Sequence, residues 1–323
     1  EAAFPEHTPS VEHVQDRVEL VLMKEGFLEV AKHYIVYRYE HTKIREVEKQ
    51  ETLEKIEDNA LHITTSDGRL EAFSETPIRK TLAKFIDDTS AIDVDAIVSQ
   101  LKYELYEGIT ANDIQRALIM VVRSMIERDP AYSKLACKLL LDRMYREVFG
   151  KNFDRENPTK AQAEVFARNI RAAVTRGDLD MRMAEFDLEK LGASLVLSND
   201  TLFEYMGLEI MSSRYCMEDV ETKKQLETPQ MLWMRTAMGL ALNEKPEDRE
   251  RVVMEFYEVL SNFYYTPGGR TLFQAGAKKA QLSNCFLNVV PDALDGIFKS
   301  FSDNSQYLKW SGGTGTSWSK VRA

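Results

Sequence analysis

The chain has 323 residues, of which 44% are hydrophobic and 29% charged, with 15 Gly and 9 Pro. This composition is typical of a folded, helix-rich protein of two or three domains. The sequence contains no run of about 20 apolar residues, which excludes a membrane-spanning helix, and its first residues lack the regions of a signal peptide. The formal net charge of -10 argues against a nucleic acid as a partner, because phosphate backbones are bound by basic surfaces.

The cysteines, Cys137, Cys216 and Cys285, are few and widely spaced. They fit neither a disulfide framework nor a CxxC metal site, so we expect no bound metal. Free, isolated cysteines are typical of a reducing compartment, and a cytoplasmic location is expected.

Two segments near the N-terminus share one plan. Residues 14–38 and 114–143 each have apolar residues at helical spacing, then a short break, then a second helix. The breaks fall at Glu25-Gly26 and at Asp129-Pro130. We interpret the two segments as copies of one helical unit.

The second copy has an upstream half that the first copy lacks. Residues 61–80 predict two short strands joined by an Asp67-Gly68 turn, followed by a helix that starts near Pro77. No equivalent hairpin precedes the first copy, and the chain does not begin with Met. We therefore expect the N-terminus to be truncated.

The middle of the chain is predicted to be helical. Residues 151–200 are charged, with a helix start at Asn157-Pro158-Thr159. A longer helical region follows over residues 228–263, with a break at residues 243–246.

The C-terminal part changes character. After a turn cluster at residues 265–269, the pattern predicts a strand over 282–290, a helix with one apolar face from Leu294 to Leu308, a glycine loop at Ser311–Gly315 and a strand within 316–322. The glycine loop has no Walker motif, and its glycines are interpreted as allowing a tight turn. Two parallel strands do not form a stable sheet alone, so further strands are expected from elsewhere.

The same C-terminal part carries three motifs: RTLFQAG at residues 270–276, QLSNCFLNVVPDALDGIF at 281–298 and KWSGGTGTSWSKVRA at 309–323. In this order and at this spacing they resemble the class I ribonucleotide reductase large subunit, the catalytic subunit. Farther upstream, residues 128–150 resemble the end of the family's ATP-cone, and residues 201–217 with the ETPQ element at 227–230 resemble its helical domain.

The resemblance implies a fold that is mainly α with an α/β C-terminal part. Residues 1–50 would be the C-terminal half of a first ATP-cone, and residues 60–149 a second, degenerate cone. Residues 150–264 would form the helical N-terminal reductase domain. Residues 265–323 would begin a ten-stranded α/β barrel.

The resemblance also implies a chemistry. The family replaces the ribose 2′-hydroxyl with hydrogen by radical chemistry, and a redox cysteine pair supplies the electrons. Cys285 matches the first cysteine of that pair, whereas a buried strand cysteine is the alternative reading. Thr271 and Asn284 match substrate-binding positions; the family often has Ser where this chain has Asn284, and Thr271 is otherwise a turn residue after two glycines.

Asp292, Lys309 and Arg322 match the family's allosteric site for a deoxyribonucleotide effector at the dimer interface. A carboxylate suits the deoxyribose hydroxyl, and two cations suit the phosphates. Alternatively, Asp292 caps a helix and Lys309 complements the helix dipole.

The second cone lacks the cations that a triphosphate needs. The family's basic pair before the hairpin turn is replaced by Thr65-Ser66, and a further Lys is replaced by Pro77. We expect residues 60–149 not to bind ATP. The first cone is then the expected ATP and dATP receptor.

By this resemblance the segment itself binds no cofactor other than nucleotide effectors, and the radical comes from a metal-containing small subunit. Further expected partners are the remaining part of the large subunit, as the rest of a fragment or as a separate chain, a second copy of the subunit, and thioredoxin or glutaredoxin. Three other readings stay open: an adenosylcobalamin-dependent reductase, a non-catalytic ATP-cone regulatory protein, and a helical scaffold with chance motif matches.

Overall fold

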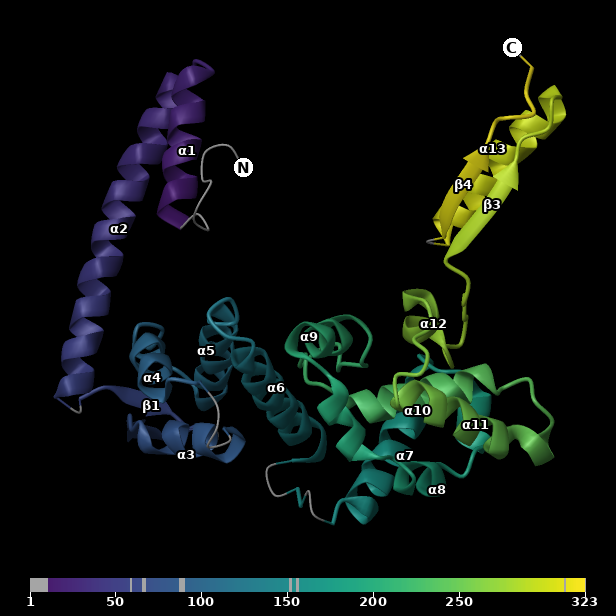
Figure 1. Ribbon diagram of the computed structural model, residues 1–323, viewed down its shortest axis with the longest axis horizontal. Helices are drawn as coiled ribbons and strands as arrows, with labels where there is room; N and C mark the ends of the chain where they lie inside the picture. The colour runs from purple at the N-terminus through teal and green to yellow at the C-terminus, as the bar shows by residue number, and fades with distance from the viewer. Residues whose placement is uncertain are drawn as a thin grey trace. The chain divides into compact units, whose positions relative to one another are not determined.

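The computed structural model describes residues 11–58, 60–65, 68–86, 91–150, 153–154, 157–310 and 312–322. The described residues belong to two units, one within residues 1–84 and 93–121, the other within 85–92 and 122–323. Most of them are helical, with a parallel strand pair near the C-terminus (Figure 1). This confirms the expected fold, mainly α with an α/β C-terminal part.

The first unit contains a pair of helices, followed by a β-hairpin and further helices. Its elements are α1 (Val11–Lys24), α2 (Leu28–Glu57), β1 (His62–Thr64), β2 (Leu70–Ala72), α3 (Thr76–Phe85), α4 (Val94–Lys102) and most of α5 (Ala111–Ser124). Leu61, Leu82, Ile97 and Leu101 form part of a buried core around the hairpin and the helices that follow it.

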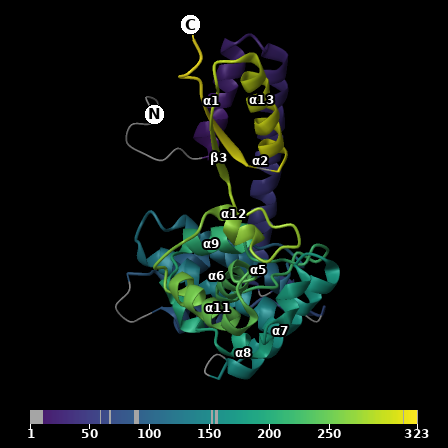
Figure 2. The same ribbon diagram turned by 90° about the vertical axis from the view of Figure 1, so that its right-hand side faces the viewer.

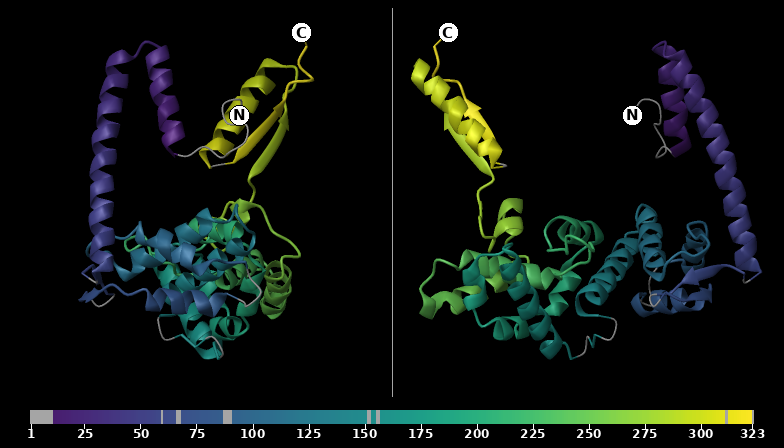
Figure 3. Two further views of the ribbon diagram at one scale, coloured as in Figure 1. Left: turned by 60° about the vertical axis from the view of Figure 1, so that its left-hand side comes forward. Right: turned by 180° about the vertical axis from the view of Figure 1, so that it is seen from behind.

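Helices α1 and α2 form an antiparallel hairpin (Figure 3). The turn between them lies at the predicted break, where Gly26 has φ +83°, a conformation that glycine adopts without strain. Arg38 of α2 binds Asp16 and Glu19 of α1, each at 2.7 Å. The apolar stripe of α1 is not buried in the described residues, since Val14 is 50% exposed and Val21 51%.

The predicted β-hairpin of the second copy is present. Strands β1 and β2 are antiparallel, with His62 opposite Ala72 and Thr64 opposite Leu70. Gly68 has φ +83° in the turn, while Asp67 lies outside the described residues. Helix α3 begins at Thr76, which confirms the helix start near Pro77.

The second unit is a helical assembly followed by the strand pair. Its elements are α6 (Ala131–Phe149), α7 (Thr159–Arg176), α8 (Leu188–Ala193), α9 (Tyr205–Arg214), α10 (Pro229–Leu240), α11 (Pro246–Ser261), α12 (Gly269–Gln274), β3 (Cys285–Val289), α13 (Leu294–Lys309) and β4 (Gly313–Ser317), with short 3-10 helices η1 (Met181–Glu185) and η2 (Leu197–Leu202).

Helix α10 is the centre of this assembly. Every residue from Pro229 to Met238 is buried, so the helix has no solvent-facing side over that stretch. It packs against α11 and α12. The predicted break at residues 243–246 is confirmed, because α11 begins at Pro246, a position that favours proline.

A buried polar network joins four elements of this core. Tyr145 of α6 and Gln230 of α10 donate hydrogen bonds to the Asp200 carboxylate at 2.5 and 2.8 Å. The Gln230 side-chain oxygen accepts from Tyr257 and Ser261 of α11 at 2.7 and 2.8 Å. Burial raises the pKa of Asp200 to about 7, although the two hydrogen bonds act in the opposite direction.

Asp200→Asn is expected to flatten the pH dependence of stability. The native state keeps a proton on Asp200 up to a pKa of about 7, whereas an unfolded Asp releases it near a pKa of about 3.9. The contribution of the protonated Asp200 to the free energy of unfolding is therefore fully present below about pH 4. It is lost as the pH rises towards 7, by at most about 4 kcal/mol. Denaturant unfolding of both proteins between pH 4 and 8 measures this; equal slopes would count against Asp200 as the source.

The C-terminal strand pair differs in detail from the prediction. Strand β3 begins at Cys285 and is parallel to β4, with Cys285 opposite Gly313 and Val289 opposite Ser317, and α13 packs along the pair (Figure 2). Strand β4 begins three residues before the predicted strand, so the predicted Ser311–Gly315 loop was wrong over residues 313–315, as was the strand beyond Ser317; Ser311 lies outside the described residues.

The prediction of β4 was wrong because its glycines were interpreted only as turn residues. A Cβ at Gly312 would lie 2.6 Å from the Phe286 ring, and one at Gly315 would lie 2.7 Å from the Leu287 side chain. Both glycines make room for neighbouring side chains of β3, and Gly315 lies within β4.

Apolar side chains of this βαβ unit remain uncovered. Leu287 is 87% exposed, and the α13 residues Leu294, Phe298 and Phe301 are 73%, 68% and 53% exposed. No helix within the described ranges has both the length and the apolar character to cross a membrane.

Candidate active site

The candidate substrate-binding residues lie where α12 meets the linker (residues 275–284) that leads into β3. Thr271 is part of α12, so the alternative reading of a turn residue is wrong. Its hydroxyl donates to the Leu282 carbonyl at 3.1 Å. The Gln274 side chain accepts from the Gln281 N–H at 2.8 Å. The linker therefore folds back along α12 and brings Thr271 close to the start of β3.

Cys285 is the first residue of β3, a free thiol with an exposed side chain. Its partner on β4 is Gly313, which has no side chain that could cover the sulfur. The alternative of a buried strand cysteine is therefore not what the structure shows. Cys137 and Cys216 are buried, and burial raises the pKa of Cys137 to about 12 and that of Cys216 well above its usual value. Both remain protonated, unreactive thiols at neutral pH.

Asn284 is exposed and lies beside Gly268, the N-cap of α12. A Cβ at Gly268 would lie 3.2 Å from the Asn284 amide nitrogen, and one at Gly269 would lie 2.7 Å from the Tyr215 hydroxyl. The backbone carbonyl of Asn284 accepts from the Gly313 N–H at 2.8 Å. Thr271, Asn284 and Cys285 are thus gathered around one short segment.

The three candidate effector residues are only partly brought together. Asp292 and Arg322 form an ion pair at 3.2 Å. Lys309 lies at the far end of the 16-residue helix α13, about 24 Å along its axis from the end that follows Asp292. Asp292 does not cap this helix, because the N-cap is Ala293 and has no side-chain cap bond.

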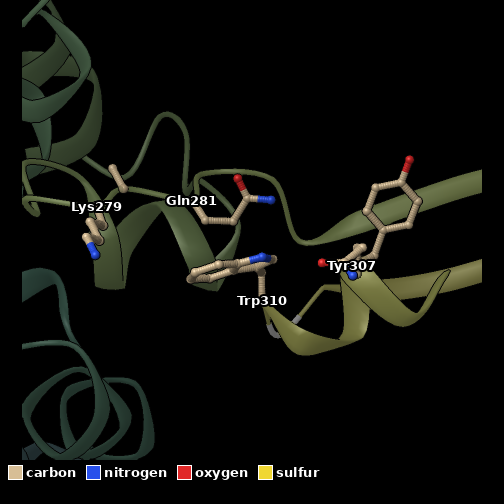
Figure 4. A pocket seen from close by; sticks show the side chains of 6 residues that line it. Lys279, Gln281, Tyr307 and Trp310 are labelled. Atoms are coloured by element: carbon tan, nitrogen blue, oxygen red, sulfur yellow. The ribbon is translucent and has the colours of Figure 1, made fainter. Parts of the chain in front are cut away.

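A cavity of about 390 Å³ lies where the linker passes the end of α13 (Figure 4). Its lining comprises Lys279, Ala280, Gln281, Gln306, Tyr307 and Trp310. Tyr307 also stacks on Phe286 of β3, with ring centroids 4.4 Å apart. The cavity therefore adjoins the segment that carries Asn284 and Cys285.

Sequence reasoning missed Arg270, which donates from Nη2 to the Trp310 carbonyl at 2.7 Å and so ties α12 to the end of α13. It also missed Arg235 and Glu227, a buried ion pair beneath α12. Their only local sign is an Arg inside an apolar helix and a Glu two residues before a proline. Among the residues that the structure describes, no three His, Cys, Asp or Glu side chains cluster as metal ligands would.

Comparison with protein families finds three matches along the chain. The model of the ATP cone domain matches residues 3–43, that of the ribonucleotide reductase all-alpha domain residues 201–280, and that of the ribonucleotide reductase barrel domain residues 283–323. The chain belongs to the ribonucleotide reductase large-subunit family. The resemblance to a class I large subunit, in its N-terminal part with ATP-cone regions, is thereby confirmed.

Individual reductases match over most of the chain. The ribonucleoside-diphosphate reductase subunit alpha of Chlamydia trachomatis is 36% identical over 320 residues, which is 97% of this chain and 30% of that protein. The subunit alpha of Helicobacter pylori is 30% identical over 262 residues, 81% of this chain and 32% of that protein. The chain therefore spans about a third of the length of these relatives. Cys285, Asp292, Lys309 and Arg322 fall in the barrel match, and Thr271 falls in the all-alpha match.

Proposed function

We propose that the chain supplies part of the catalytic subunit of a ribonucleotide reductase that acts on ribonucleoside diphosphates, the substrate level in its relatives' names. One observation carries the assignment to this site: Cys285 is an exposed thiol at the start of a strand, opposite a glycine, directly after Asn284 and three residues after Leu282, whose carbonyl Thr271 binds. In this proposal Cys285 faces the ribose, and Thr271 and Asn284 contact the substrate.

The redox balance requires a second thiol. Reduction breaks the C2′–O bond, releases water and forms a C2′–H bond, while two thiols become one disulfide. Cys137 and Cys216 are buried, so neither can serve, and the partner thiol belongs to residues outside this chain. Exchange with thioredoxin or glutaredoxin then restores the pair.

Asp292, Lys309 and Arg322 are proposed to bind a deoxyribonucleotide effector. Because α13 separates Lys309 from the Asp292–Arg322 pair, one nucleotide contacts all three only if Lys309 comes from a second copy. In this proposal the effector binds at an interface between two subunits of a homodimer or a higher oligomer.

Within the described residues of the second cone, cations near the hairpin are already paired with carboxylates. Of the cations near its hairpin, Arg79 is paired with Glu75 and Asp95 at 3.1 and 2.7 Å, and Lys102 is paired with Glu75 at 2.6 Å. Their charges are already compensated by carboxylates. We propose that ATP binds the first cone, where the ATP cone model matches.

Nucleotide titrations are expected to separate these sites. In the assembled reductase, Arg322→Ala should weaken dNTP binding at the effector site by about tenfold or more, since a charge-assisted contact to phosphate is lost. Calorimetric titration of residues 60–149 should show no ATP binding. Unchanged dNTP affinity in the variant would remove Arg322 from the site, and micromolar ATP binding to the segment would refute the degenerate cone.

The proposed partners are the remaining part of the large subunit and a metal-containing small subunit that supplies the radical, in a reducing cytoplasm. The name subunit alpha in the relatives supports a second subunit type over an adenosylcobalamin-dependent enzyme. The matches over residues 201–280 and 283–323 argue against a regulatory protein made only of cones. The experiment that tests the function is Cys285→Ser in the assembled reductase, which should lose turnover and keep nucleotide binding.

A further inference from the structure

A buried ion pair lies beneath α12. The guanidinium of Arg235 in α10 donates to both carboxylate oxygens of Glu227, at 2.7 and 3.2 Å. Each side chain is only 2% exposed. Glu227 also accepts from the Met217 N–H at 2.8 Å, so its charge is compensated by the guanidinium and by the backbone.

The same guanidinium reaches two backbone carbonyls outside its own helix. Nη1 donates to the Ala275 carbonyl at 3.0 Å, and Nη2 donates to the Tyr215 carbonyl at 3.2 Å. Ala275 is the C-cap of α12. One side chain thus connects α10 to the residue that ends α12 and to the residue after α9.

Both ends of α12 rest on these contacts. At its start, the Tyr215 hydroxyl lies against Gly269, where a Cβ would be only 2.7 Å away. At its end, Gly239 of α10 faces the backbone of Ala275 and Gly276 so closely that a Cβ would lie 2.2 Å from the Gly276 nitrogen. Arg235 and Gly239 are four residues apart and therefore lie on one face of α10.

Helix α12 in turn fixes the linker. Thr271 and Gln274 bind the backbone of Leu282 and Gln281, two and three residues before Asn284. The contacts form a continuous path from the buried pair through α12 to the start of β3. Each step of this path is a hydrogen bond or a direct packing contact between described residues.

Burying an ion pair in a core costs free energy of desolvation. Removing two charges from water costs several kcal/mol per ion, and apolar residues of similar volume often stabilise as well or better. The fork of Arg235 has a use that an apolar residue lacks, because it holds two carbonyls and a carboxylate in fixed directions. This favours a role in placing α12 over a role in stability alone.

We propose that Arg235, oriented by Glu227, is a positioning residue that sets α12 so that Thr271 and Cys285 face one substrate. The inference rests on the proposed reductase function for the meaning of that placement. The placement itself can be measured without any turnover.

The test uses Arg235→Lys in the assembled reductase. Lysine keeps a positive charge beside Glu227, but one ammonium nitrogen cannot occupy the positions of both Nη atoms. The matched control is Arg171→Lys, because Arg171 also donates two hydrogen bonds to one carboxylate, from Nη1 and Nη2 to Glu189 at 2.7 and 3.0 Å, but is exposed.

We expect the Leu272 and Ala275 amides, which bond the Gly268 and Thr271 carbonyls inside α12, to exchange with solvent about tenfold faster in Arg235→Lys. The KM for the nucleoside diphosphate should rise by about tenfold while kcat changes less, as expected when ground-state binding is lost. Arg171→Lys should match the wild type in both measurements.

If Arg235→Lys does not fold, the neutral double variant Arg235→Met/Glu227→Gln removes both charges at similar volume and takes the same measurements. Wild-type exchange of the α12 amides in a folded variant would overturn the proposal, and so would faster exchange with an unchanged KM. If Cys285→Ser retained turnover, the reductase function would fail, yet amide exchange would still decide whether Arg235 positions α12.

Discussion

Cys285→Ser is expected to lower turnover of the assembled reductase by about three orders of magnitude or more, the size of loss seen when a group that does covalent chemistry is removed. A serine hydroxyl cannot form the disulfide that accepts the oxidation. The side chain is exposed at the start of β3, so the substitution should disturb neither the fold nor the binding of nucleotides. Formation of deoxyribonucleoside diphosphate and equilibrium substrate binding are the two measurements.

Cys137→Ala is the control for this variant. The Cys137 thiol is buried and donates to the Phe203 carbonyl at 3.3 Å, so its loss should reduce stability slightly and leave turnover intact. Unchanged turnover in Cys285→Ser would remove this thiol from the chemistry and with it the proposed function.

Gly239→Ala is expected to destabilise the second unit by about 3 kcal/mol. The new Cβ would lie 2.2 Å from the Gly276 nitrogen and 2.5 Å from the Ala275 carbonyl carbon. Both are backbone atoms and cannot rotate away as a side chain could, so α10 and α12 must separate. Denaturant unfolding of the chain measures the loss.

The matched substitution is Gly207→Ala in α9. There the nearest atom to the new Cβ is Phe203 Cδ1 at 3.6 Å, an ordinary contact, and alanine gains up to about 1 kcal/mol in helix propensity. We expect this variant to be as stable as the wild type or slightly more stable. Equal losses of stability in the two variants would show that the loss in Gly239→Ala does not arise from the packing of α10 on Ala275 and Gly276.

The elements that local pattern defines were predictable. The break at Glu25-Gly26, the hairpin within residues 61–80 and the start of α11 after residues 243–246 each follow from periodicity and from residues that favour turns or helix starts. The grouping of Asp292 with Arg322 came from the resemblance to the reductase family, and the structure pairs them.

Features that depend on contacts between residues far apart in the sequence were not predictable. The glycines at 312 and 315 looked like a turn, but their function is to admit Phe286 and Leu287 from another strand. Helix α12 has only six residues, too few for a periodic pattern. Arg235 contacts residues 215, 227 and 275, and no local window contains all of them.

The pairing of Cys285 with Gly313 has a consequence for selectivity. On its own sheet, the sulfur has a neighbour made only of backbone, so that strand neither shields the thiol nor discriminates among molecules by size. Selection among ligands at this sulfur must therefore come from residues other than the one opposite it on β4.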